Sequence, residues 1–415
     1  MRFVADLHIH SHYSRATSRE MSPEALWRWA QLKGITVIGT GDFTHPGWVA
    51  ELKEKIEPAA EGLFGLKKRL QSGEVPASCR ADVRFLLSAE ISCIYRKNGK
   101  TRKVHAILFA PGFGDAERIA VSLAKIGNLR SDGRPILGLD AKELLRIVKD
   151  TSPEAMLVPA HVWTPHFSVF GAASGFDTLQ ECFDELTPHI HAIETGLSSD
   201  PPMNWRLSAL DRITLISNSD AHSPAKIGRE ANIFGTDLSY PSLVGAIKTR
   251  KGFLGTIEFF PEEGKYHNDG HRVCGVNLTP KETGGHSCRC PACGKKVTVG
   301  VMHRVEALSD RDEGVRPHGA PGFHSVIPLP EIIAEALGVG SSSKAVAKVY
   351  HELLERLGNE FVILLDLPPE EISEAGYPQI AQAVSMVRSG NVSITPGFDG
   401  EYGKIRIFGK GAKKE

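Results

Sequence analysis

The chain has 415 residues, more than the ~250 to 300 at which a single core usually stops growing, so we expect one large domain with smaller attachments. Its composition, 41% hydrophobic and 24% charged, is ordinary for a globular protein and excludes a collagen-like or disordered chain. Lys plus Arg equals Asp plus Glu, 49 of each, so a site for a polyanion must be a local patch. The apolar runs are too short for a membrane span, and Asp6 comes too early for a signal peptide, so we expect a cytoplasmic protein.

From Met1 to about Phe260, short β-branched runs alternate with amphipathic stretches. Ser22-Pro23-Glu24 begins a helix that Gly34 can end, and Asp140 with Glu143 has the spacing of a capping box. Alternation of this kind is typical of a parallel sheet wrapped by helices, so we predict an α/β fold with a barrel as its leading architecture. The strand candidates are Phe3–His8, Thr36–Thr40, Val83–Ile91, Val104–Ala110, Met156–Ala160, Ile190–Glu194 and Ile213–Ser217.

The dipeptide Asn98-Gly99 lies between two strand-like runs and predicts a tight hairpin turn. The tip of this hairpin is either exposed to solvent without a partner or binds along the phosphate backbone of a nucleic acid, and both interpretations stay open. The basic residues around it are Arg96, Lys97, Lys100, Arg102 and Lys103.

The second half of the chain changes in composition. From Gly264 to about Arg304 it is dense in His, Cys and Gly, and it holds four of the seven cysteines, which indicates a metal site rather than disulfides and suits a reducing compartment. Further on, Glu331–Leu337 and Ser343–Leu357 predict two helices joined by Gly338-Val339-Gly340, a helical hairpin. We predict three domains: a metal-dependent catalytic barrel over 1–262, a zinc-binding module over 263–306, and an α+β C-terminal domain with the hairpin over 307–415.

The segment Asp6-Leu7-His8-Ile9-His10 carries the strongest sign of chemistry. Alternate residues of an extended chain point to the same side, so His8 and His10 can share a metal. Because the strand ends of an α/β barrel share the face where active sites are built, further ligands are expected at such ends. The candidates that follow or end a predicted strand are Asp42, Glu90, His161, Asp220 and His222.

Two ligand assignments stay open. His105 lies inside a predicted strand and is either a metal ligand or a hydrogen-bonded core residue. The loop Gly41-Asp42-Phe43-Thr44-His45 offers a carboxylate and an imidazole, of which we expect one to bind metal. Mixed imidazole and carboxylate ligands favour zinc, manganese or iron over magnesium or calcium.

Such a cluster lowers the pKa of bound water, and a metal pair clamps the attacking and leaving oxygens of an in-line displacement, which predicts phosphoester hydrolysis. A single structural zinc with surplus surface histidines is the alternative. We assign Glu90 to catalysis as well as to metal binding, and Asp200, after another predicted strand, as a general acid or water-orienting group. Asp200 can equally cap the helix that begins at Pro201.

The spacing of His271-x2-Cys274 and Cys290-x2-Cys293 supplies the two ligand pairs of a structural zinc. The second pair lies in a knuckle-type turn whose glycine, Gly294, supplies the unusual backbone angle. Cys288 competes with His271 for the fourth place, and free buried cysteines are the alternative to a zinc site.

Two segments, Asp6-Leu7-His8-Ile9-His10-Ser11 and Asn218-Ser219-Asp220-Ala221-His222, resemble the first and last motifs of the PHP (polymerase and histidinol phosphatase) superfamily, with Glu90 and Ala160-His161 matching positions between them. The resemblance implies a distorted (βα)7 barrel over residues 1 to 260 with two or three divalent ions, for which zinc, manganese and magnesium are candidates. Where the superfamily usually has Thr-Asp-His, this chain reads Gly41-Asp42-Phe43, so Asp42 or His45 must serve instead.

Segments outside the barrel resemble the endonuclease Q family of PHP-type DNA repair enzymes, and the likeness spans nearly the whole chain. It implies an endonuclease that nicks on the 5′ side of deaminated bases (hypoxanthine, uracil, xanthine) and abasic sites. Damaged double- or single-stranded DNA is then the expected partner, with other repair or replication proteins as further partners. The segments that carry the likeness are Lys265–Cys274, Cys290–Gly294, His303–Glu306 and Pro396–Lys404.

A protein without net charge needs a local means of holding DNA. Gly338 and Gly340 would expose backbone N–H groups ahead of a helix N-terminus, and Lys344 lies just beyond, so the hairpin is a candidate DNA-binding site. A plain connection between helices is the alternative.

The first hypothesis is therefore a deaminated-DNA endonuclease. The second is a PHP-type phosphomonoesterase for a small phosphorylated metabolite, in which the C-terminal half is a lid or an oligomer contact; a small substrate, however, needs no zinc module. The third is a nucleic-acid-binding scaffold with a disused barrel, against which the nearly complete ligand set counts.

Overall fold

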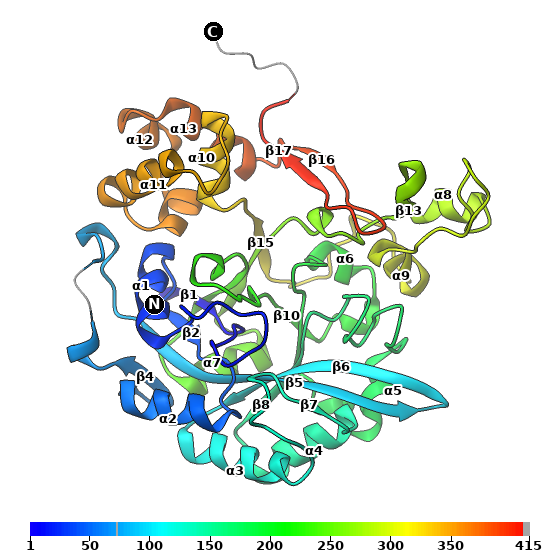
Figure 1. The fold of residues 1–415 in the computed structure, drawn as a ribbon, viewed down its shortest axis with the longest axis horizontal. Helices are drawn as coiled ribbons and strands as arrows, with labels where there is room; N and C mark the ends of the chain where they lie inside the picture. Colours follow the sequence, from blue (N-terminus) through cyan, green and yellow to red (C-terminus); the bar gives the residue numbers. More distant parts are fainter. Residues whose placement is uncertain (72–73, 410–415) are drawn as a thin grey trace.

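The computed structural model describes residues 1–71 and 74–409. Its centre is one large curved sheet with helices packed around it (Figure 1). The strands of this part are β1 (Arg2–Asp6), β2 (Val37–Gly39), β3 (Ile56–Ala60), β4 (Leu63–Leu66), β5 (Arg84–Lys97), β6 (Lys100–Ala110), β7 (Ile136–Leu137), β8 (Met156–Pro159), β9 (Ala192–Glu194), β10 (Thr214–Ile216), β11 (Ala231–Gly235), β12 (Phe253–Glu258) and β15 (Gly322–Ser325).

The order of the strands brings the sheet back towards itself. β12, β11, β1, β2, β5, β6 and β8 are hydrogen-bonded neighbours in that order, and the separate parallel pair of β9 and β10 contacts β8 on one side and β12 on the other. This confirms the α/β class and gives a distorted, incompletely hydrogen-bonded barrel.

The sheet is mixed, whereas the sequence predicted parallel strands. β1, β2 and β5 run parallel, but β5, β6 and β8 alternate in direction, as do β1, β11 and β12. For β5 and β6 the physical reason is the predicted hairpin turn, since Asn98 and Gly99 both have positive φ values, 54° and 74°, and join the two strands directly. A two-residue turn of this kind forces its two strands to pair antiparallel.

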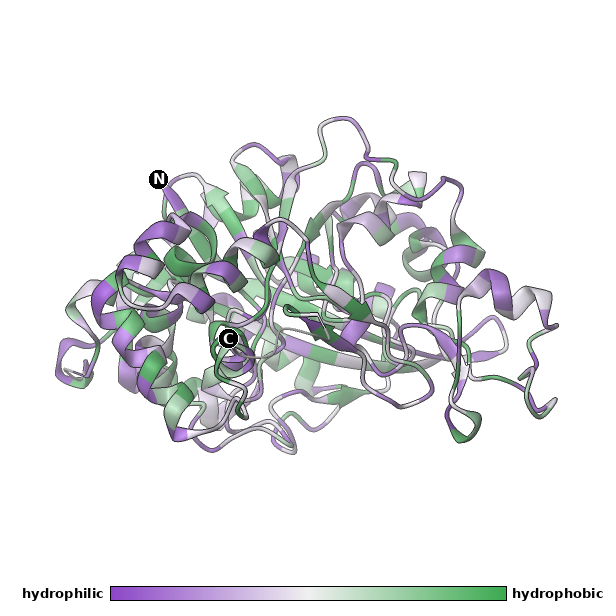
Figure 2. Cartoon of the chain, turned by 90° about the horizontal axis from the view of Figure 1, so that it is seen from above, coloured by the Kyte–Doolittle hydropathy of each residue, from purple (hydrophilic) through white to green (hydrophobic). Residues whose placement is uncertain are grey.

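Helices cover the sheet, and the apolar strands lie in the centre of the molecule (Figure 2). The Ser22 hydroxyl caps the first helix by accepting a hydrogen bond from Ala25 N, and Gly34 ends it at φ 89°, both as predicted. The Asp140 carboxylate caps another by accepting a hydrogen bond from Lys142 N. The helices are α1 (Pro23–Lys33), α2 (Pro46–Lys55), α3 (Phe113–Ala124), α4 (Ala141–Thr151), α5 (Leu179–Phe183), α6 (Pro201–Trp205) and α7 (Tyr240–Thr249).

The chain after the barrel forms two lobes, one around the cysteines and one of helices, whose apolar cluster also includes Leu32, Val75 and Cys79 of the barrel segment. The two helices of the predicted hairpin are present as α10 and α11. The elements of both lobes are β13 (Asp269–His271), β14 (Val276–Leu278), α8 (Pro280–Gly285), α9 (Val301–Leu308), α10 (Leu329–Leu337), α11 (Lys344–Leu357), α12 (Pro369–Glu374), α13 (Pro378–Arg388), β16 (Ser393–Thr395) and β17 (Lys404–Arg406).

Contacts across the predicted domain boundaries join these lobes to the barrel. β15 pairs with β12, and Val301 and Val305 of α9 lie in the barrel core. The boundaries at 262 and 306 stay predictions, and residues 410–415 of the third predicted domain lie outside the described residues. None of the helices in the described ranges is long and apolar enough to cross a bilayer.

A buried ion pair fastens α1 to the C-terminal helices. Lys33 Nζ lies 2.7 Å from Glu360 Oε2, and Tyr350 Oη donates to the same oxygen at 2.8 Å. The other oxygen of Glu360 accepts from Leu329 N at 3.0 Å. Because the paired charges are buried and hydrogen-bonded, this interface has a fixed geometry.

Candidate active site

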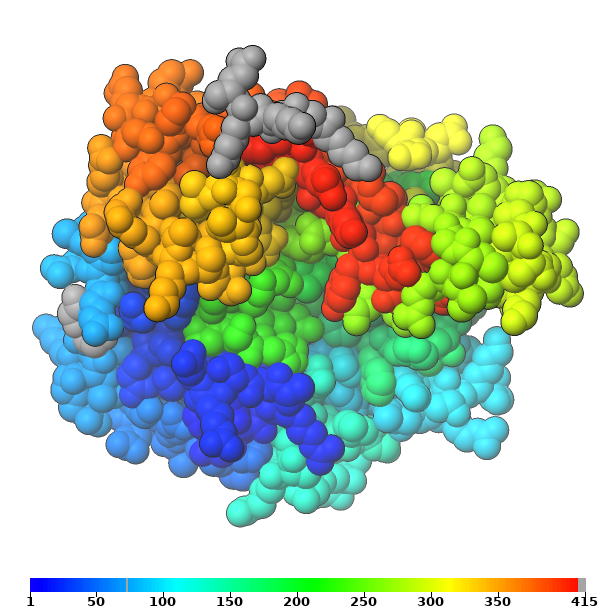
Figure 3. Space-filling view, turned by 45° about the horizontal axis from the view of Figure 1, so that its top comes forward, coloured from blue at the N-terminus to red at the C-terminus, as the bar shows by residue number. Residues whose placement is uncertain are grey.

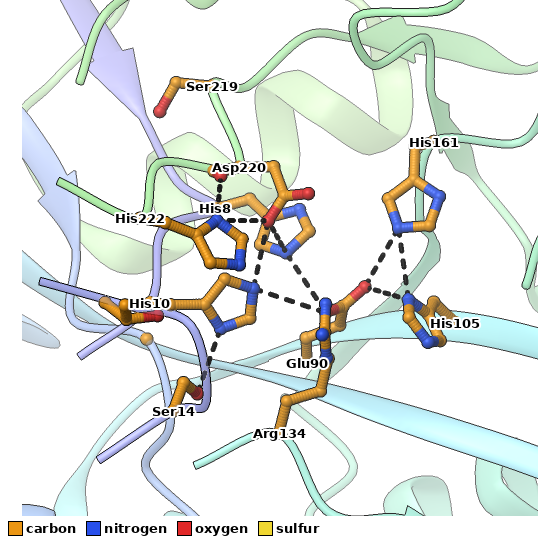
Figure 4. Close-up of polar contacts among 12 residues, drawn as sticks. His8, His10, Ser14, Glu90, His105, Arg134, His161, Ser219, Asp220 and His222 are labelled. Carbon is orange, nitrogen blue, oxygen red and sulfur yellow. Dashed lines mark hydrogen bonds and ion pairs between the residues drawn. The ribbon is translucent and has the colours of Figure 1, made fainter. Parts of the chain in front are cut away.

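Seven side chains from the carboxyl ends of several strands and from the β5–β6 hairpin converge inside the barrel (Figure 4). They form two groups of potential metal ligands whose donor atoms lie within 4.8 Å of one another: His8, His10, Glu90 and Asp220 in the first, and Glu90, His105 and His161 in the second. Glu90, near the middle of β5, belongs to both groups. His222 is the seventh side chain and lies against the first group.

In the first group, several atoms that could bind a metal lie close together and have no hydrogen-bond partner among the described residues. His10 Nε2 lies 3.0 Å from Asp220 Oδ1 and 3.3 Å from Glu90 Oε2, and His8 Nε2 lies 3.7 Å and 3.8 Å from the same two oxygens. His8 Nε2, His10 Nε2 and Asp220 Oδ1 are buried without a hydrogen-bond partner among the described residues. A buried polar atom without a partner costs ~1–3 kcal/mol, and a cation among these three would satisfy all of them at once. The residues therefore fit a divalent ion.

The second group faces the other oxygen of Glu90. Glu90 Oε1 lies 2.7 Å from His105 Nδ1 and 3.0 Å from His161 Nε2, and these two nitrogens are 3.2 Å apart. His105 Nε2 bonds to Ser92 Oγ at 2.8 Å, so the ring is hydrogen-bonded in the core and still presents Nδ1 to the cluster. Both sequence interpretations of His105 thus describe part of its environment.

Buried carboxylates hold the histidines of the first group from behind. Glu194 lies 3.0 Å from His8 Nδ1 and also accepts hydrogen bonds from His161 N and Asn218 Nδ2. Asp42 lies 3.1 Å from His10 Nδ1. Carboxylates in this position fix the ring orientation of a ligating histidine and raise its basicity.

The structure brings neither Asp42 nor His45 into the two groups, so neither is among the ligands that the geometry favours. The second oxygen of Asp42 accepts hydrogen bonds from Ser11 N, Ser11 Oγ and Ser14 Oγ, so both oxygens already have partners. His45 Nδ1 accepts from Trp48 N and caps α2, while its Nε2 donates to Arg130 O. Both nitrogens of His45 are therefore in use.

His222 lies beside the first group without belonging to it. Its ring centre is 4.6 Å from that of His10, and its Nδ1 donates to the backbone oxygen of Asp220 at 2.8 Å. Nε2 of this tautomer carries a lone pair, so His222 as a metal ligand stays a prediction.

The charges of the cluster stabilise each other. Burial alone raises the pKa of the Glu90 carboxyl, but the imidazoles of His105, His10 and His161 hold it well below its usual range. Burial alone lowers the pKa of the His8 and His10 imidazoles, but the carboxylates of Glu194 and Asp220 raise it well above the ordinary value. Protons and cations therefore compete for these nitrogens, and binding of a metal weakens as pH falls.

Asp200 caps a helix, the alternative that its sequence context offered. Its side chain accepts a hydrogen bond from Met203 N at 2.9 Å at the start of α6. Burial, with a smaller contribution from Glu262, raises the pKa of Asp200 to about 7. No recorded contact among the described residues links this carboxyl to the two groups.

Two residues of the site were missed in the sequence. Glu194 ends a predicted strand, Ile190–Glu194, so the rule that selected the other ligands could have found it. Arg134 donates to Glu90 Oε2 at 3.2 Å from a loop that carries no recognisable pattern.

The predicted zinc ligands come together in the lobe beside the barrel. His271, Cys274, Cys290 and Cys293 place one donor atom each within 4.8 Å of the others, and Cys293 Sγ lies 3.7 Å from His271 Nδ1. Cys288 stands outside this group and packs against a small apolar cluster, so the geometry favours His271 as the fourth ligand.

The helical hairpin has only part of the predicted anion site. Gly338 ends α10 at φ 66°, and its N–H is used by the carbonyls of Ala334 and Glu335. Gly340 and Lys344 are exposed, so they remain candidates for contacts with DNA. In Figure 3 this hairpin (yellow to orange) borders the green surface of the barrel, with the C-terminal strands (red) on the far side of a hollow.

Comparisons with known sequences find one relative of similar length and one much longer relative, of which this chain matches about a third. The family described as MJ0043 C-terminal domain matches residues 328–391, the segment of α10 to α13. The uncharacterized protein YqxK of Bacillus subtilis is 29% identical over 420 residues, which cover 98% of this chain and 99% of YqxK. The uncharacterized protein MJ0043 of Methanocaldococcus jannaschii is 32% identical over 251 residues, 59% of this chain, and the match spans only 31% of that protein.

Two solved structures are similar over almost the whole chain. One is the lesion-specific endonuclease PfuEndoQ of Pyrococcus furiosus, with a TM-score of 0.86 and 32% identity over 98% of this chain and 95% of that one. The other is endonuclease Q in complex with a 27-mer duplex substrate that has an abasic lesion at the active site, with a TM-score of 0.83 and 32% identity over 98% and 96% of the two chains. Identity and coverage at this level show that the chain belongs to the endonuclease Q family.

Proposed function

We propose that this protein is a metal-dependent DNA repair endonuclease that hydrolyses the phosphodiester on the 5′ side of deaminated bases (hypoxanthine, uracil, xanthine) and abasic sites. The observation that carries the proposal is the position of Glu90, whose two oxygens face two separate groups of imidazole and carboxylate donors. A carboxylate shared in this way is suited to bridging two cations. Two-metal sites are a recurring solution for nucleases.

The proposed ligand sets follow from the two groups. His8, His10, Glu90 and Asp220 would hold one ion, and Glu90, His105 and His161 a second, with zinc, manganese or magnesium as candidates. His222 would complete a third position. Bound ions would activate a water and neutralise charge on the phosphate. Glu194 and Asp42 would keep the rings of His8 and His10 in place during the reaction.

DNA is the proposed partner because a related structure holds a duplex with an abasic lesion at its active site. On this chain, exposed Gly340 and Lys344 of the hairpin and exposed Arg96 and Lys100 at the β5–β6 turn are the proposed contacts to the backbone. Two other basic residues of that turn already have partners, since Lys97 pairs with Asp184 and Arg102 lies over the ring of Phe176.

The test uses end-labelled duplexes that carry one hypoxanthine, uracil, xanthine or abasic site, each incubated with zinc, manganese or magnesium. We expect a nick on the 5′ side of the lesion and no cleavage of the undamaged duplex. An Asp220→Asn enzyme should bind less metal and cut poorly, while Glu374→Gln on the exposed face of α12 serves as the matched control. Release of phosphate from small phosphomonoesters with the duplex intact would replace this proposal with the phosphomonoesterase.

A further inference from the structure

Arg134 occupies a special place at the edge of the candidate active site. Among the described residues it is the only Lys or Arg whose side chain is recorded in contact with a member of the two ligand groups, through Nη1 and Glu90 Oε2 at 3.2 Å. The Arg134 side chain is 29% exposed, whereas the Glu90 side chain is 0% exposed. The guanidinium therefore contacts the buried carboxylate of Glu90 and is itself partly open to solvent (Figure 4).

The loop before Arg134 is fastened to the segment that carries His10. Asp132 Oδ1 accepts hydrogen bonds from Arg134 N and Arg15 N, and Gly133 N donates to Tyr13 O at 3.0 Å. Gly133 packs so closely that an added Cβ would lie 2.3 Å from Asp42 Oδ2 and 2.4 Å from Ser14 Oγ. A side chain at position 133 would displace the carboxylate that orients His10.

The chain after Arg134 is fastened to the strand that carries Glu90. Ser92 N donates to Pro135 O at 3.0 Å, and β7 then pairs with β5, with Ile136 opposite Ser92. Arg134 is thus held between the two elements that supply His10 and Glu90. Such double anchoring fixes the position of the guanidinium relative to the cluster.

Most of the donors of Arg134 have no recorded partner. The guanidinium carries five N–H groups, and within the described residues only the bond to Glu90 is recorded for its side chain. A single bond of this kind leaves a fork of donors that matches the oxygens of a phosphate group. The neighbouring Arg130 is also exposed but contributes only its backbone oxygen, which accepts from His45.

We propose that Arg134 is a catalytic residue that binds a non-bridging oxygen of the scissile phosphate and stabilises the negative charge that develops there. The inference rests on the proposed function. In the reaction the oxygen of a water forms a bond to phosphorus while one P–O ester bond breaks, and the proton that water loses balances the one gained by the leaving oxygen. Arg134 donates hydrogen bonds throughout and keeps its proton.

The test compares Arg134→Gln, Arg134→Lys and the matched control Arg130→Gln on a duplex with one abasic site. Loss of one donor to a developing oxyanion slows catalysis ~10²- to 10³-fold, and we expect a loss of this size in the single-turnover rate for Arg134→Gln. Arg134→Lys should recover part of the rate because it keeps the charge without the fork. Metal content and thermal midpoint should stay close to those of the wild type, and DNA affinity without metal should fall much less than the rate.

Phosphorothioate at the scissile position gives a readout that a structural role would not move. Sulfur in place of the oxygen facing Arg134 should slow the wild type, and this thio effect should shrink in Arg134→Gln for one diastereomer only. Equal thio effects in both enzymes, a wild-type rate in Arg134→Gln, or a rate that falls only with metal content would each overturn the proposal. Failure of the wild type to cut any lesion overturns the proposed function itself.

Discussion

The two groups of potential metal ligands that share Glu90 lie inside the barrel. The four predicted zinc ligands, His271, Cys274, Cys290 and Cys293, lie in a small lobe at the outer edge of the molecule (Figure 1). Around Glu90, the side chains of His8, His10 and Glu90 are at most 2% exposed, and Glu194 and Asp42 hold the rings from behind. In the outer lobe, Cys293 is exposed and the recorded apolar cluster has only Leu278, Cys290 and Val297 as its buried members.

This difference indicates what each metal would do. Side chains fixed by a large core need no cation to hold their geometry, so ions bound at Glu90 would be available for chemistry. A lobe with so small an apolar cluster would gain its folding free energy mainly from a bound metal, as structural zinc sites do. The following experiments test this contrast.

The largest expected effect is on the outer lobe. In zinc-binding peptides the metal contributes ~10–16 kcal/mol, so Cys293→Ser should release zinc and unfold the lobe while the barrel keeps its melting transition. Limited proteolysis with zinc analysis measures both. Cys288→Ser is the control. Cys288 lies outside the group of four, so this variant should retain zinc. Equal loss of zinc in both variants would contradict the choice of His271 over Cys288 as the fourth ligand.

For Glu90→Gln we expect a smaller change in the free energy of unfolding but an almost complete loss of DNA cleavage. Removing the shared carboxylate should lower cleavage ~10³-fold or more, because metal ions supply several kcal/mol and each 1.36 kcal/mol is tenfold. Single-turnover cleavage and bound metal are the measurements. The fold should survive, since Gln has nearly the same volume. Full metal content with full activity would contradict the assignment of both ligand groups.

Glu194→Gln tests the residues that only orient the ligands. Substitution of such a carboxylate typically costs ~10- to 100-fold in metal affinity or activity, and we expect a loss of that size here. A metal titration of activity separates the two, since added metal should recover most of the loss. Glu374→Gln, on an exposed helix, should leave the titration unchanged. A loss as large as that of Glu90→Gln would contradict the assignment of Glu194 as a residue that only orients the ligands.

The smallest effect concerns Asp200, which lies outside both groups. Its folded-state pKa of about 7 exceeds the ordinary 3.8, so the folded protein holds a proton that the unfolded chain has released. Stability should therefore fall as pH rises from about 4 to about 7, and Asp200→Asn should remove this part of the pH dependence. Thermal midpoints at pH 5 and pH 8 measure it. A cleavage rate far below that of the wild type would instead support the catalytic role predicted from the sequence.

Much of the fold and of the gathering of side chains could be predicted from the sequence. Each of the seven predicted strands is present, and the side chains at their ends converge as a barrel requires. His8, His10, Glu90, His161 and Asp220 could be chosen because each stands at a recognisable place in a strand pattern. The short strands β11 and β12 had no prediction, and with them the antiparallel side of the sheet was missed.

The structure departs from the expected site where the position of a residue in the sequence does not decide which of its atoms are free. Asp42 and His45 have the right chemistry and the right loop, but the atoms that would bind a metal are hydrogen-bonded to Ser11, Trp48 and Arg130. Arg134 has no periodic pattern around it, and its place follows from contacts with residues 13 to 15 and 92. Such contacts between distant segments are not visible in local sequence.

The pairing of β1 with β11 has a consequence for how the protein is made. Phe3 lies opposite Phe234, and the first ligand group combines His8 with Asp220, so both the strand ladder and the cluster join the two ends of the barrel segment. Domains fold largely as units during synthesis, and pairings between distant segments form late. A ribosome-bound chain therefore lacks the β1–β11 ladder until residues 231–235 have emerged, so we expect an unfinished chain not to cut DNA.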